Sequence, residues 1–212
     1  MDSSIQRIRR LSPSDYRVMP WKNGCGTTTE IAVDPPGAGI DAFAWRLSVA
    51  DLAASGPFSS FPGYDRIIIQ TEGEPMSLVH ADRGRHRLDL LSPYRFEGEW
   101  LTWGELAAPP VRDFNVMTRR DRLRADATVH RLARGGAVRL SSTAATRIVY
   151  ALRGAIAIRG AAPGTALELG AEETLLLAGD PGATRGIDLE IRAAEVEAVV
   201  FVMELDPRPA GR

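Results

Sequence analysis

Short apolar segments with a two-residue alternation recur along the chain, separated from one another by glycine and proline. A period of two places successive side chains on opposite faces of a β-strand, whereas segments with the helical period of about 3.6 residues are hard to find here. The pattern therefore predicts an all-β protein. The predicted strands are residues 27–33, 43–50, 65–73, 75–81, 85–91, 112–120, 127–132, 136–142, 146–154, 155–160, 174–179 and 197–205.

The strand pattern repeats with an offset of 81 residues. The segment DRIIIQTEG, with Arg66 and Gly73, aligns with TRIVYALRG, with Arg147 and Gly154, and further on FEGE aligns with LAGD. A repeat of this length indicates a duplicated structural unit. We predict two jelly-roll-like antiparallel β-barrels that arose by internal duplication.

The two halves differ in their polar residues. The second half is rich in Ala, Leu, Val and Gly, while unusual polar residues gather in the first. We therefore expect residues 1–120 to form an N-terminal barrel with a ligand pocket and residues 121–212 to form a C-terminal barrel with a structural role. The boundary falls near residues 118–127, TRRDRLRADA, a charged run that is also typical of a solvated linker.

Composition narrows the classes of function. The 212 residues are 44% hydrophobic and 25% charged, which is typical of a globular protein. The 26 basic and 27 acidic residues give a formal charge of −1, so we expect neither nucleic acid nor an anionic membrane as a partner. The apolar runs are too short to span a bilayer and the first residues lack the apolar core of a signal peptide, so we expect a soluble, cytoplasmic protein.

Cysteine and histidine are scarce. The single cysteine, Cys25, excludes an internal disulfide and a cysteine-rich zinc site. Three histidines are spread over fifty residues, and none forms a His-x-His pair that would place two imidazoles on one face of a strand. We therefore predict no metal site and no cofactor.

One lysine and one asparagine stand out in the segment PWKNGCGTTTEI. Lys22 is the only lysine, since the other 25 basic residues are arginine, and Asn23 is one of two asparagines. Such a skew is typical of a GC-rich coding background, against which these residue types are more readily retained where they are needed. Gly24 and Gly26 permit a close backbone approach to a ligand. The segment is not a P-loop, because its lysine precedes the glycines and no helix follows.

Alternation in the predicted strands places further polar residues on shared faces. In the strand 43–50, Arg46 and Ser48 share one face, and in 112–120, Asn115 shares a face with Asp113 and Met117. Each face could equally point to solvent, as one face of an antiparallel strand usually does. Asparagine is disfavoured within strands, however, so Asn115 indicates a directed hydrogen bond.

The strand 27–33 offers polar groups on both faces. Thr29 lies on one face and Glu30 on the other, and the sequence does not show which of them points inward. The loop SGPFSSFPGYDR, which precedes the strand 65–73, contains Phe61; it can cap the end of a barrel and line a ligand at the same time.

Four segments together resemble one family of bacterial proteins. PWKNGCGTTTEI, FAWRLSVADLAASGPFSSFPGYDR, FEGE and DFNVMTRR are similar to the HutD/Ves family, over roughly residues 11–120. The resemblance implies a bicupin fold and a cytoplasmic location. It also implies, for the HutD branch, an association with histidine utilisation and the binding of a small metabolite, whereas the Ves branch is described only as stress-related.

From these observations we predict a metal-independent bicupin that binds a small carboxylate, linked to the regulation of histidine utilisation. Urocanate and a formylated or imino glutamate derivative are the candidates that the resemblance implies. Cations in a cavity require either a counter-ion from the protein or an anionic ligand. Glu30 and Asp65 are near enough in sequence to be the counter-ion. The predicted ligand-binding residues are Lys22, Asn23, Thr29, Glu30, Arg46, Ser48, Phe61, Arg66 and Asn115.

Two other functions stay open. The first is a metal-free acid–base isomerase or hydrolase with Glu30 or Lys22 as the proton carrier, although no catalytic residue can be assigned. The second is a protein-interaction module that presents Trp100 and Trp103, although packing of these rings is the commoner use. Cys25 suits a small packed thiol better than a nucleophile. A homodimer is compatible with the sequence.

Overall fold

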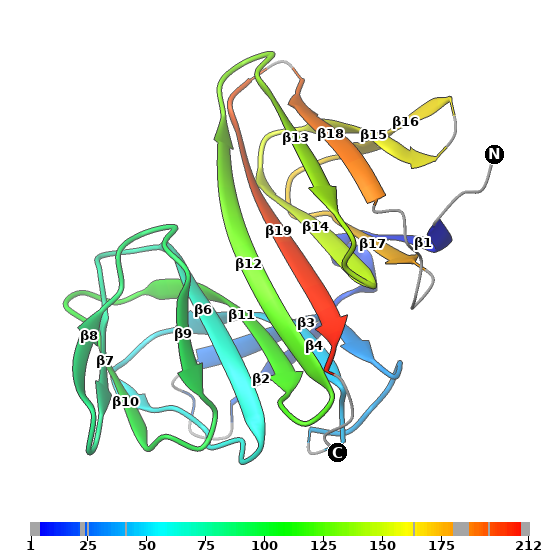
Figure 1. The fold of residues 1–212 in the computed structure, drawn as a ribbon. Helices are drawn as coiled ribbons and strands as arrows, with labels where there is room; N and C mark the ends of the chain where they lie inside the picture. The colour runs from blue at the N-terminus through cyan, green and yellow to red at the C-terminus, as the bar shows by residue number, and fades with distance from the viewer. Residues whose placement is uncertain are drawn as a thin grey trace. The chain divides into compact units, whose positions relative to one another are not determined.

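The computed structural model describes residues 5–21, 24, 26–40, 42–162, 164–179, 187–194 and 196–208. Nineteen β-strands and one short 3-10 turn, Pro13–Asp15, are the regular elements of this part of the chain (Figure 1). No helix in the described residues is long and apolar enough to cross a membrane. The prediction of an all-β protein is confirmed.

The chain divides into two compact units, of which the first comprises Tyr16–Arg124 together with Arg208. One sheet of this unit has the order β2-β3-β4-β11-β6-β9, and the other has the order β5-β10-β7-β8. The strands are β2 (Arg17–Pro20), β3 (Gly26–Asp34), β4 (Trp45–Leu52), β5 (Gly56–Pro57), β6 (Tyr64–Glu72), β7 (Ser77–His80), β8 (Gly84–Arg87), β9 (Tyr94–Glu97), β10 (Thr102–Glu105) and β11 (Val111–Arg119).

The second unit comprises residues 5–15 together with Ala125–Pro207. Its two sheets have the orders β1-β17-β14-β19-β12 and β13-β18-β15-β16. The strands are β1 (Ile5–Leu11), β12 (Leu123–Leu132), β13 (Ala137–Ser142), β14 (Thr146–Arg153), β15 (Ile156–Ala162), β16 (Thr165–Leu169), β17 (Thr174–Gly179), β18 (Ile187–Ala193) and β19 (Ala198–Pro207). Among the described residues, the two sheets of each unit are packed face to face and are not hydrogen-bonded into a closed cylinder.

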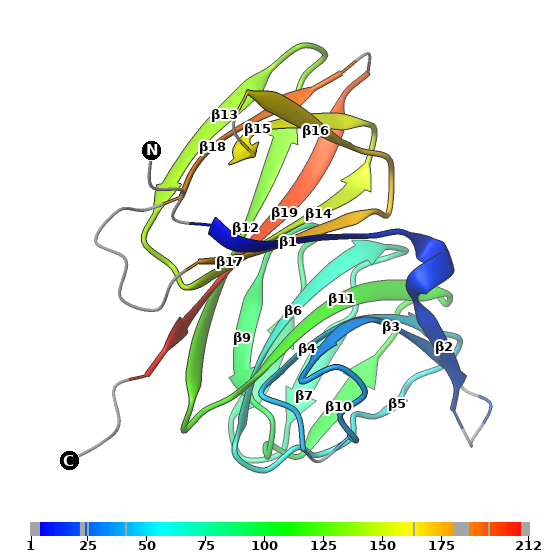
Figure 2. The same cartoon turned by 90° about the vertical axis from the view of Figure 1, so that its right-hand side faces the viewer.

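Every predicted strand coincides with an observed one, and seven short or charged strands escaped prediction: β1, β2, β5, β9, β10, β16 and β18. The structure also changes two details of the expected organisation. β1 pairs with β17 and so belongs to the second unit, although residues 1–120 were expected to form the first barrel (Figure 2). The charged run 118–127 comprises the end of β11, a turn and the start of β12, and in the turn Arg122 donates a backbone hydrogen bond to Arg119 (3.0 Å).

The sequence repeat is also a repeat of strand register. Arg66 on β6 lies opposite Phe96 on β9, and Arg147 on β14 lies opposite Leu177 on β17, so both pairs keep the same offset of 81 residues. In each unit this pair of strands continues into a third, because β6 pairs with β11 and β14 pairs with β19. The two units therefore present equivalent interior positions, which can be compared residue by residue.

Each unit has its own apolar core between its two sheets. In the second unit the cluster includes Val149, Ile158, Leu189 and Val200, which come from both sheets. In the first unit the described apolar residues form separate clusters, one that includes Ile68 and one that includes Phe43. Buried polar residues such as Asn115 and Asp113 also lie in this unit.

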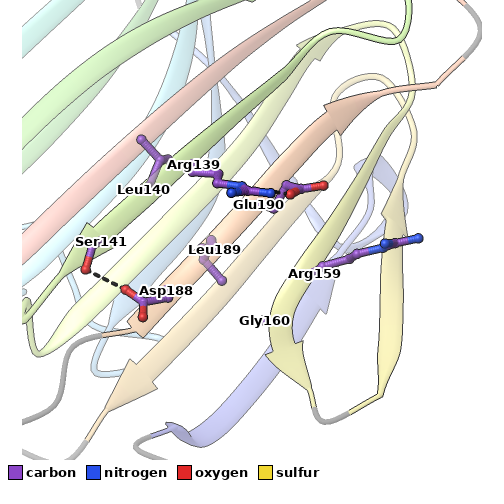
Figure 3. Close-up of a pocket in the computed structure, with 8 residues that line it drawn as sticks. All are labelled: Arg139, Leu140, Ser141, Arg159, Gly160, Asp188, Leu189 and Glu190. Carbon is purple, nitrogen blue, oxygen red and sulfur yellow. Dashed lines mark hydrogen bonds and ion pairs between the residues drawn. The ribbon is translucent and has the colours of Figure 1, made fainter.

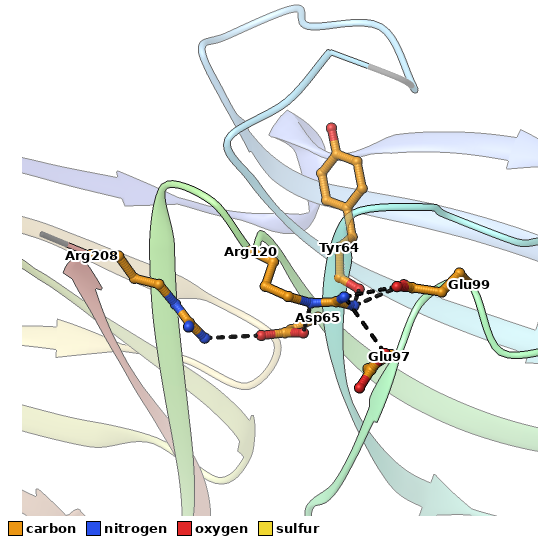
Figure 4. A network of polar contacts seen from close by, with 6 residues as sticks. All are labelled: Tyr64, Asp65, Glu97, Glu99, Arg120 and Arg208. Carbon is orange, nitrogen blue, oxygen red and sulfur yellow. Dashed lines mark hydrogen bonds and ion pairs between the residues drawn. The ribbon is translucent and has the colours of Figure 1, made fainter. Parts of the chain in front are cut away.

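Arg120 organises a network of ions in the first unit (Figure 4). Its guanidinium binds Asp65 (Nε to Oδ1, 2.6 Å) and Glu99 (Nη1 to Oε1, 2.7 Å), and it donates to the backbone oxygen of Tyr64 (3.0 Å). Arg208 binds the second oxygen of the Asp65 carboxylate at 3.3 Å. The hydrogen bonds from Arg120 lower the pKa of Glu99 below its usual range. The network ties the end of β6 to residues before β10, after β11 and after β19.

Gly73, which follows β6, lies in a turn that is repeated in the second unit and requires glycine. Gly73 has φ +87°, and a Cβ atom there would lie 2.5 Å from the backbone oxygen of Pro110. Both the left-handed backbone and the clash oppose a side chain, so Gly73→Ala is expected to lower the free energy of unfolding by about 2–4 kcal/mol. The equivalent Gly154 has φ +74° and the same 2.5 Å approach to a backbone oxygen, that of Glu197.

Urea denaturation followed by circular dichroism measures this change. Gly39→Ala is the matched control, because nothing lies within 4 Å of its Cβ position and its φ is not in the left-handed region. We expect the control to stay within about 0.5 kcal/mol of the wild type. Equal stability of the two variants would contradict the close approach described for Gly73.

Candidate ligand-binding site

A cavity of about 550 Å³ lies in the first unit, against the interior face of the sheet that contains β4, β11 and β6. Its size is in the range of small-molecule pockets, about 300–1,000 Å³. Polar side chains from three adjacent strands form its floor, and the segment before β3 and the loop 58–63 complete its walls. The lining residues are Met19, Pro20, Trp21, Thr28, Ile40, Arg46, Ser48, Ala50, Pro57, Phe58, Ser59, Phe61, Arg66, Asp113, Asn115 and Met117.

Antiparallel register arranges the floor in rows across the strands. Met117 on β11 lies between Arg46 on β4 and Arg66 on β6, and in the next row Asn115 has Ser48 as its partner on β4. Residues two apart on a strand point to the same face, so each of these strands contributes alternate residues to the cavity. The guanidinium groups therefore come from opposite sides of the central strand.

Arg66 is buried in a cage of aromatic rings. Its guanidinium carbon lies 4.9 Å from the ring centroid of Phe96, 5.3 Å from that of Phe58 and 5.9 Å from that of Phe61. Such contacts stabilise a cation through the negative faces of the rings. Burial nevertheless lowers the pKa of Arg66 to about 10, and the charge of Arg46 contributes in the same direction. Arg66 remains a cation at neutral pH.

The hydrogen bonds of Arg66 leave part of its guanidinium free. Its Nη2 donates to Oδ1 of Asn115 (2.8 Å) and its Nη1 donates to the backbone oxygen of Ser59 (3.4 Å). Its Nε is buried and has no hydrogen-bond partner. No ion pair joins Arg66 to an acidic side chain of the described residues. Arg66 thus lines the cavity with an unused donor and without a directly bonded carboxylate, which is costly in the absence of a ligand or water.

Asp113 continues this chain of polar groups. The Nδ2 of Asn115 donates to Oδ1 of Asp113, while Oδ2 of Asp113 is buried without a partner. Burial raises the pKa of Asp113 to about 7, against opposing effects of the Arg66 charge and of the hydrogen bond from Asn115. Near neutral pH the carboxyl group is therefore divided between its charged and neutral forms.

The second arginine of the cavity is already neutralised. Arg46 Nε donates to Oε2 of Glu30 at 2.7 Å, and both side chains are largely buried. This pairing follows from register, because Glu30 lies opposite Ser48, which is two residues from Arg46 on β4. Glu30 therefore serves as the counter-ion that the sequence suggested. Arg66 is the cation left to meet a ligand.

Apolar and aromatic side chains surround the polar floor. Trp21 Nε1 donates to Oγ1 of Thr28 at 2.8 Å, which fixes the indole at the side of the cavity. Gly104 lies beneath Phe58, since a Cβ atom there would meet its ring at 2.6 Å. Phe61 packs against Phe43 and Tyr64 at centroid distances of 6.3 Å each. These contacts hold the aromatic wall beside Arg66.

The predicted site residues separate into three groups. Arg46, Ser48, Phe61, Arg66 and Asn115 line the cavity together. Glu30 reaches it through its ion pair with Arg46, whereas Thr29 lies on the other face of β3, opposite Val49, and Thr28 takes the place on the wall. Lys22, Asn23 and Cys25 lie outside the described residues.

Sequence reasoning missed Asp113 as a site residue. The alternation of the strand places Asp113 on the same face as Asn115, so the pattern indicates its position. The prediction included only the asparagine of this face. Asp65, the second suggested counter-ion, is instead bound to Arg120 and Arg208.

The second unit supplies a comparison for Arg66. The equivalent Arg147 binds Glu204 (Nη2 to Oε1, 2.7 Å) and donates to the backbone oxygens of Leu140 (3.3 Å) and Ile187 (2.7 Å). Its Nε also lacks a partner, but its charge is neutralised by Glu204. Glu204 lies opposite Arg147 on β19, at the position that Met117 occupies opposite Arg66 on β11.

The other interior positions of the second unit are apolar. Val200 and Val202 on β19 are the equivalents of Asp113 and Asn115 on β11, because each pair precedes its arginine-facing residue by four and two positions. The valines belong to the apolar core of the second unit. Asp113 and Asn115 of the first unit thus occupy positions at which the second unit has valine side chains.

The second unit also has a surface groove of about 430 Å³ between β13, β18 and β15 (Figure 3). Its polar groups already have partners: Ser141 donates to Asp188, and Glu190 accepts from Arg139 at 3.0 Å. The side chain of Arg159 points away from these pairs (Figure 3). This groove lacks a buried, unpartnered charge of the kind that Arg66 provides.

Other candidate groups are engaged in packing. His80 is buried and bonded to Thr102 (2.9 Å) and Tyr94 (3.1 Å), and His86 stacks on Tyr94 with a centroid distance of 3.7 Å. In the described part of the chain, no cluster of three His, Cys, Asp or Glu side chains is placed to hold a metal ion. Trp100 packs against the core, while Trp103 is 47% exposed.

The raised pKa of Asp113 makes stability depend on pH. The pKa is 3.8 for an ordinary aspartate and about 7 here, so between these values the folded state binds more protons than the unfolded state. Stability therefore falls as pH rises from 4 to 7 and then levels off. Relative to Asp113→Asn, which does not titrate, the wild type is expected to lose up to about 4 kcal/mol between pH 4 and pH 8.

Urea unfolding of both proteins at several pH values measures this difference, in which the contributions of all other groups cancel. Asp82→Asn, at an exposed turn, is the control for the removal of a carboxylate from the surface. A pH-independent difference between the wild type and Asp113→Asn would mean that Asp113 keeps one protonation state over this range.

Comparison with known proteins assigns this chain to a family. The HutD family profile matches residues 13–198. A 21.2 kDa protein from the hutC 3′ region of Pseudomonas putida is 38% identical over 147 residues, which are 69% of this chain and 75% of the relative. Protein Ves of Cronobacter sakazakii is 39% identical over 147 residues, which are 66% of this chain and 76% of the relative.

Solved structures agree with this relationship. The structure of HutD from Pseudomonas fluorescens SBW25, recorded under a formate condition, is 32% identical and has a TM-score of 0.79, covering 96% of this chain and all of that one. A cupin 2 conserved barrel domain protein from Leptotrichia buccalis, 9% identical, has a TM-score of 0.52 and covers 97% of this chain and 92% of that one, which shows the fold alone. The chain therefore belongs to the HutD family and has a cupin-like fold.

Proposed function

We propose that the first unit binds a small carboxylate metabolite in its cavity, with Arg66 as the group that holds the anion. The observation that carries the proposal is the state of Arg66, a buried cation with a free Nε donor and no ion pair among the described residues. A guanidinium fork matches the two oxygens of a carboxylate better than other anion-binding side chains do. The ligand accepts the unused hydrogen bond and places a carboxylate against the guanidinium, which no side chain of the described residues does.

The contrast with Arg147 supports this role. The same interior arginine is neutralised by Glu204 in the second unit, where the surrounding positions are aliphatic. Replacing buried hydrocarbon by a polar chain often lowers stability, so the presence of the chain indicates a role other than folding. The second unit is therefore proposed to act as a structural partner, and the first as the binding unit.

The expected affinity is moderate. A charge-assisted hydrogen bond contributes about 1.5–3 kcal/mol net. Two or three such bonds give about 4–8 kcal/mol, which corresponds to dissociation constants between about 1 mM and 1 µM. Affinities in this range suit a cytoplasmic protein that senses an abundant metabolite. They are weaker than those of tightly held cofactors.

The family relationship suggests which acids to test. One relative is named for the hutC 3′ region, and a HutD structure was recorded under a formate condition. We infer a link between this chain and the regulation of histidine utilisation. The test panel is therefore formate, urocanate, and the formylated and imino derivatives of glutamate.

An acid–base enzyme is the second candidate function. Glu30, the proton carrier suggested by the sequence, is engaged by Arg46, so the role passes to Asp113. Asp113 lines the cavity, its buried Oδ2 has no hydrogen-bond partner, and its pKa of about 7 suits proton transfer at neutral pH. Conversion of an acid of the panel, followed by proton NMR and abolished in Asp113→Asn while binding persists, would favour this enzyme over a binding protein.

Substitution of Arg66 tests the proposed anion site. Arg66→Met keeps a similar volume but removes both charge and donors, so the dissociation constant for a bound acid is expected to rise at least about 100-fold. Arg66→Lys keeps the charge but lacks the planar guanidinium, so its dissociation constant is expected to lie between those of the wild type and Arg66→Met. Isothermal titration calorimetry with the acid panel measures the constants.

Arg87→Gln is the matched control, because this arginine is exposed on β8 and does not line the cavity. It is expected to bind as the wild type does, and circular dichroism verifies that each variant is folded. Absence of binding by the wild-type protein to every acid of the panel at several millimolar would overturn the proposed function.

A further inference from the structure

The cavity contains a second buried polar atom without a partner, Oδ2 of Asp113, on the same chain of hydrogen bonds as Arg66. We propose that Asp113 binds the ligand's carboxylate as a neutral acid, so that each ligand anion enters the cavity together with one proton. This inference rests on the proposed function, and it adds how the same site is regulated. It makes the protein a sensor whose affinity depends on pH.

The directions of the hydrogen bonds leave Oδ2 of Asp113 available to the ligand. Asn115 accepts from Arg66 at its Oδ1 and donates from its Nδ2 to Oδ1 of Asp113. Both functional groups of the asparagine are therefore used, and one oxygen of Asp113 is occupied. Asn115 also spaces the cation and the acid so that they do not form an ion pair with each other. A ligand carboxylate can then contact Nε of Arg66 and Oδ2 of Asp113.

The neighbours of Asp113 on the adjacent strands do not supply the missing bond. Gln70 lies opposite it on β6, but its Nε2 donates to the backbone oxygen of Glu74 (2.8 Å) and its Oε1 accepts from the backbone of Met76 (2.9 Å). On the β4 side the opposite residue is Ala50, which has no polar side-chain group. Neither cross-strand neighbour therefore donates a hydrogen bond to Oδ2.

Charge balance then requires a proton. Among the described lining residues and their partners, Arg46 cancels Glu30, and Arg66 cancels an ionised Asp113. A carboxylate added to this neutral set would give a net charge of −1 in a poorly solvated space, beside a second carboxylate. Two carboxyl groups that share such a site retain one proton between them. The proton places an O–H donor where the ligand offers an oxygen.

The charges around Asp113 are compatible with this change. Arg66 from β6 and Asn115 from β11 favour its ionised form, while burial and the charge of Asp51 from β4 favour its neutral form. The resulting pKa of about 7 means that the neutral form is already accessible before any ligand binds. Uptake of the proton therefore costs little at neutral pH and more as the pH rises.

Calorimetry counts the protons directly. Formate and an N-formylated glutamate are suitable probes, because their carboxyl groups stay ionised between pH 6 and 8.5. The binding enthalpies measured in HEPES and in Tris at pH 8 differ by the number of protons taken up times the difference between the ionisation enthalpies of the two buffers. We expect close to one proton at pH 8 and close to none at pH 5.5. The apparent dissociation constant is expected to rise about 30-fold from pH 6 to pH 8.5, as the neutral form becomes rare.

Asp113→Asn is the matched variant, since its amide has the shape of a neutral carboxylic acid and keeps a donor. It is expected to bind the same probes without proton uptake and with an affinity that does not change over this pH range. Carboxyl-carbon NMR of the aspartates in the wild-type protein, with and without probe, follows Asp113 directly and does not depend on the variant folding. It is expected to report the neutral form at pH 8 with saturating probe.

The outcomes separate the two proposals. Binding by the wild type with no proton uptake and no pH dependence overturns the role of Asp113 and leaves carboxylate binding intact. Proton uptake that persists in Asp113→Asn assigns the proton to another group and also overturns it. Absence of binding at every pH overturns the proposed function as well.

Discussion

Burial of the Arg66 guanidinium without a bonded carboxylate is the constraint on which the first unit depends. A cation in such a place must be stabilised by what surrounds it, and here three aromatic faces, a backbone oxygen and Asn115 do so. These groups come from β9, β11 and the loop 58–63, so the cage forms only when the sheet and its covering loop are both in place. The cavity exists because the cage surrounds the cation incompletely.

The duplication allows the interior residues of the two units to be compared position by position. The two units share the strand register around Arg66 and Arg147, but the first contains Asp113 and Asn115 where the second contains Val200 and Val202. The aliphatic version packs a continuous core, as the cluster around Val149 shows. The frame therefore does not need polar groups for folding. Their presence in one unit and not in the other favours a role in recognition.

Much of the fold could be predicted from the sequence, because antiparallel strands with one buried face alternate clearly. All twelve expected strands exist, and the 81-residue repeat correctly paired Gly73 with Gly154. The missed strands are mostly short or carry charges at alternate positions, as in IQRIRRL of β1. β18, IDLEIRA, does alternate and could have been predicted from the same pattern. Membership of β1 in the second unit depends on a pairing partner 163 residues away and has no local signal.

The site was harder to predict than the fold, because it depends on register. Alternation grouped Arg46 with Ser48 and Asn115 with Asp113, but only the pairing of β4 with β11 and β6 shows that these faces meet. The inward face of β3 could not be determined from its threonines, and the register shift between Glu30 and Ala32 adds to the difficulty. Asp65 is near Arg66 in sequence yet binds Arg120 and Arg208, which lie 55 and 143 residues away.

The site also divides into a rigid part and an adaptable part. Arg66, Asn115 and Asp113 sit on paired strands inside the sheet, where backbone hydrogen bonds on both sides fix their positions. Groups held in this way recognise a ligand's charged end with little reorganisation. Phe58, Ser59 and Phe61 lie on the loop 58–63, which has fewer restraints of this kind. Under the proposed function, a ligand thus meets strict requirements at its carboxylate and looser ones along the rest of its length. Acids with different tails are therefore expected to share the site, so the proton and the charge, more than the tail, decide what binds.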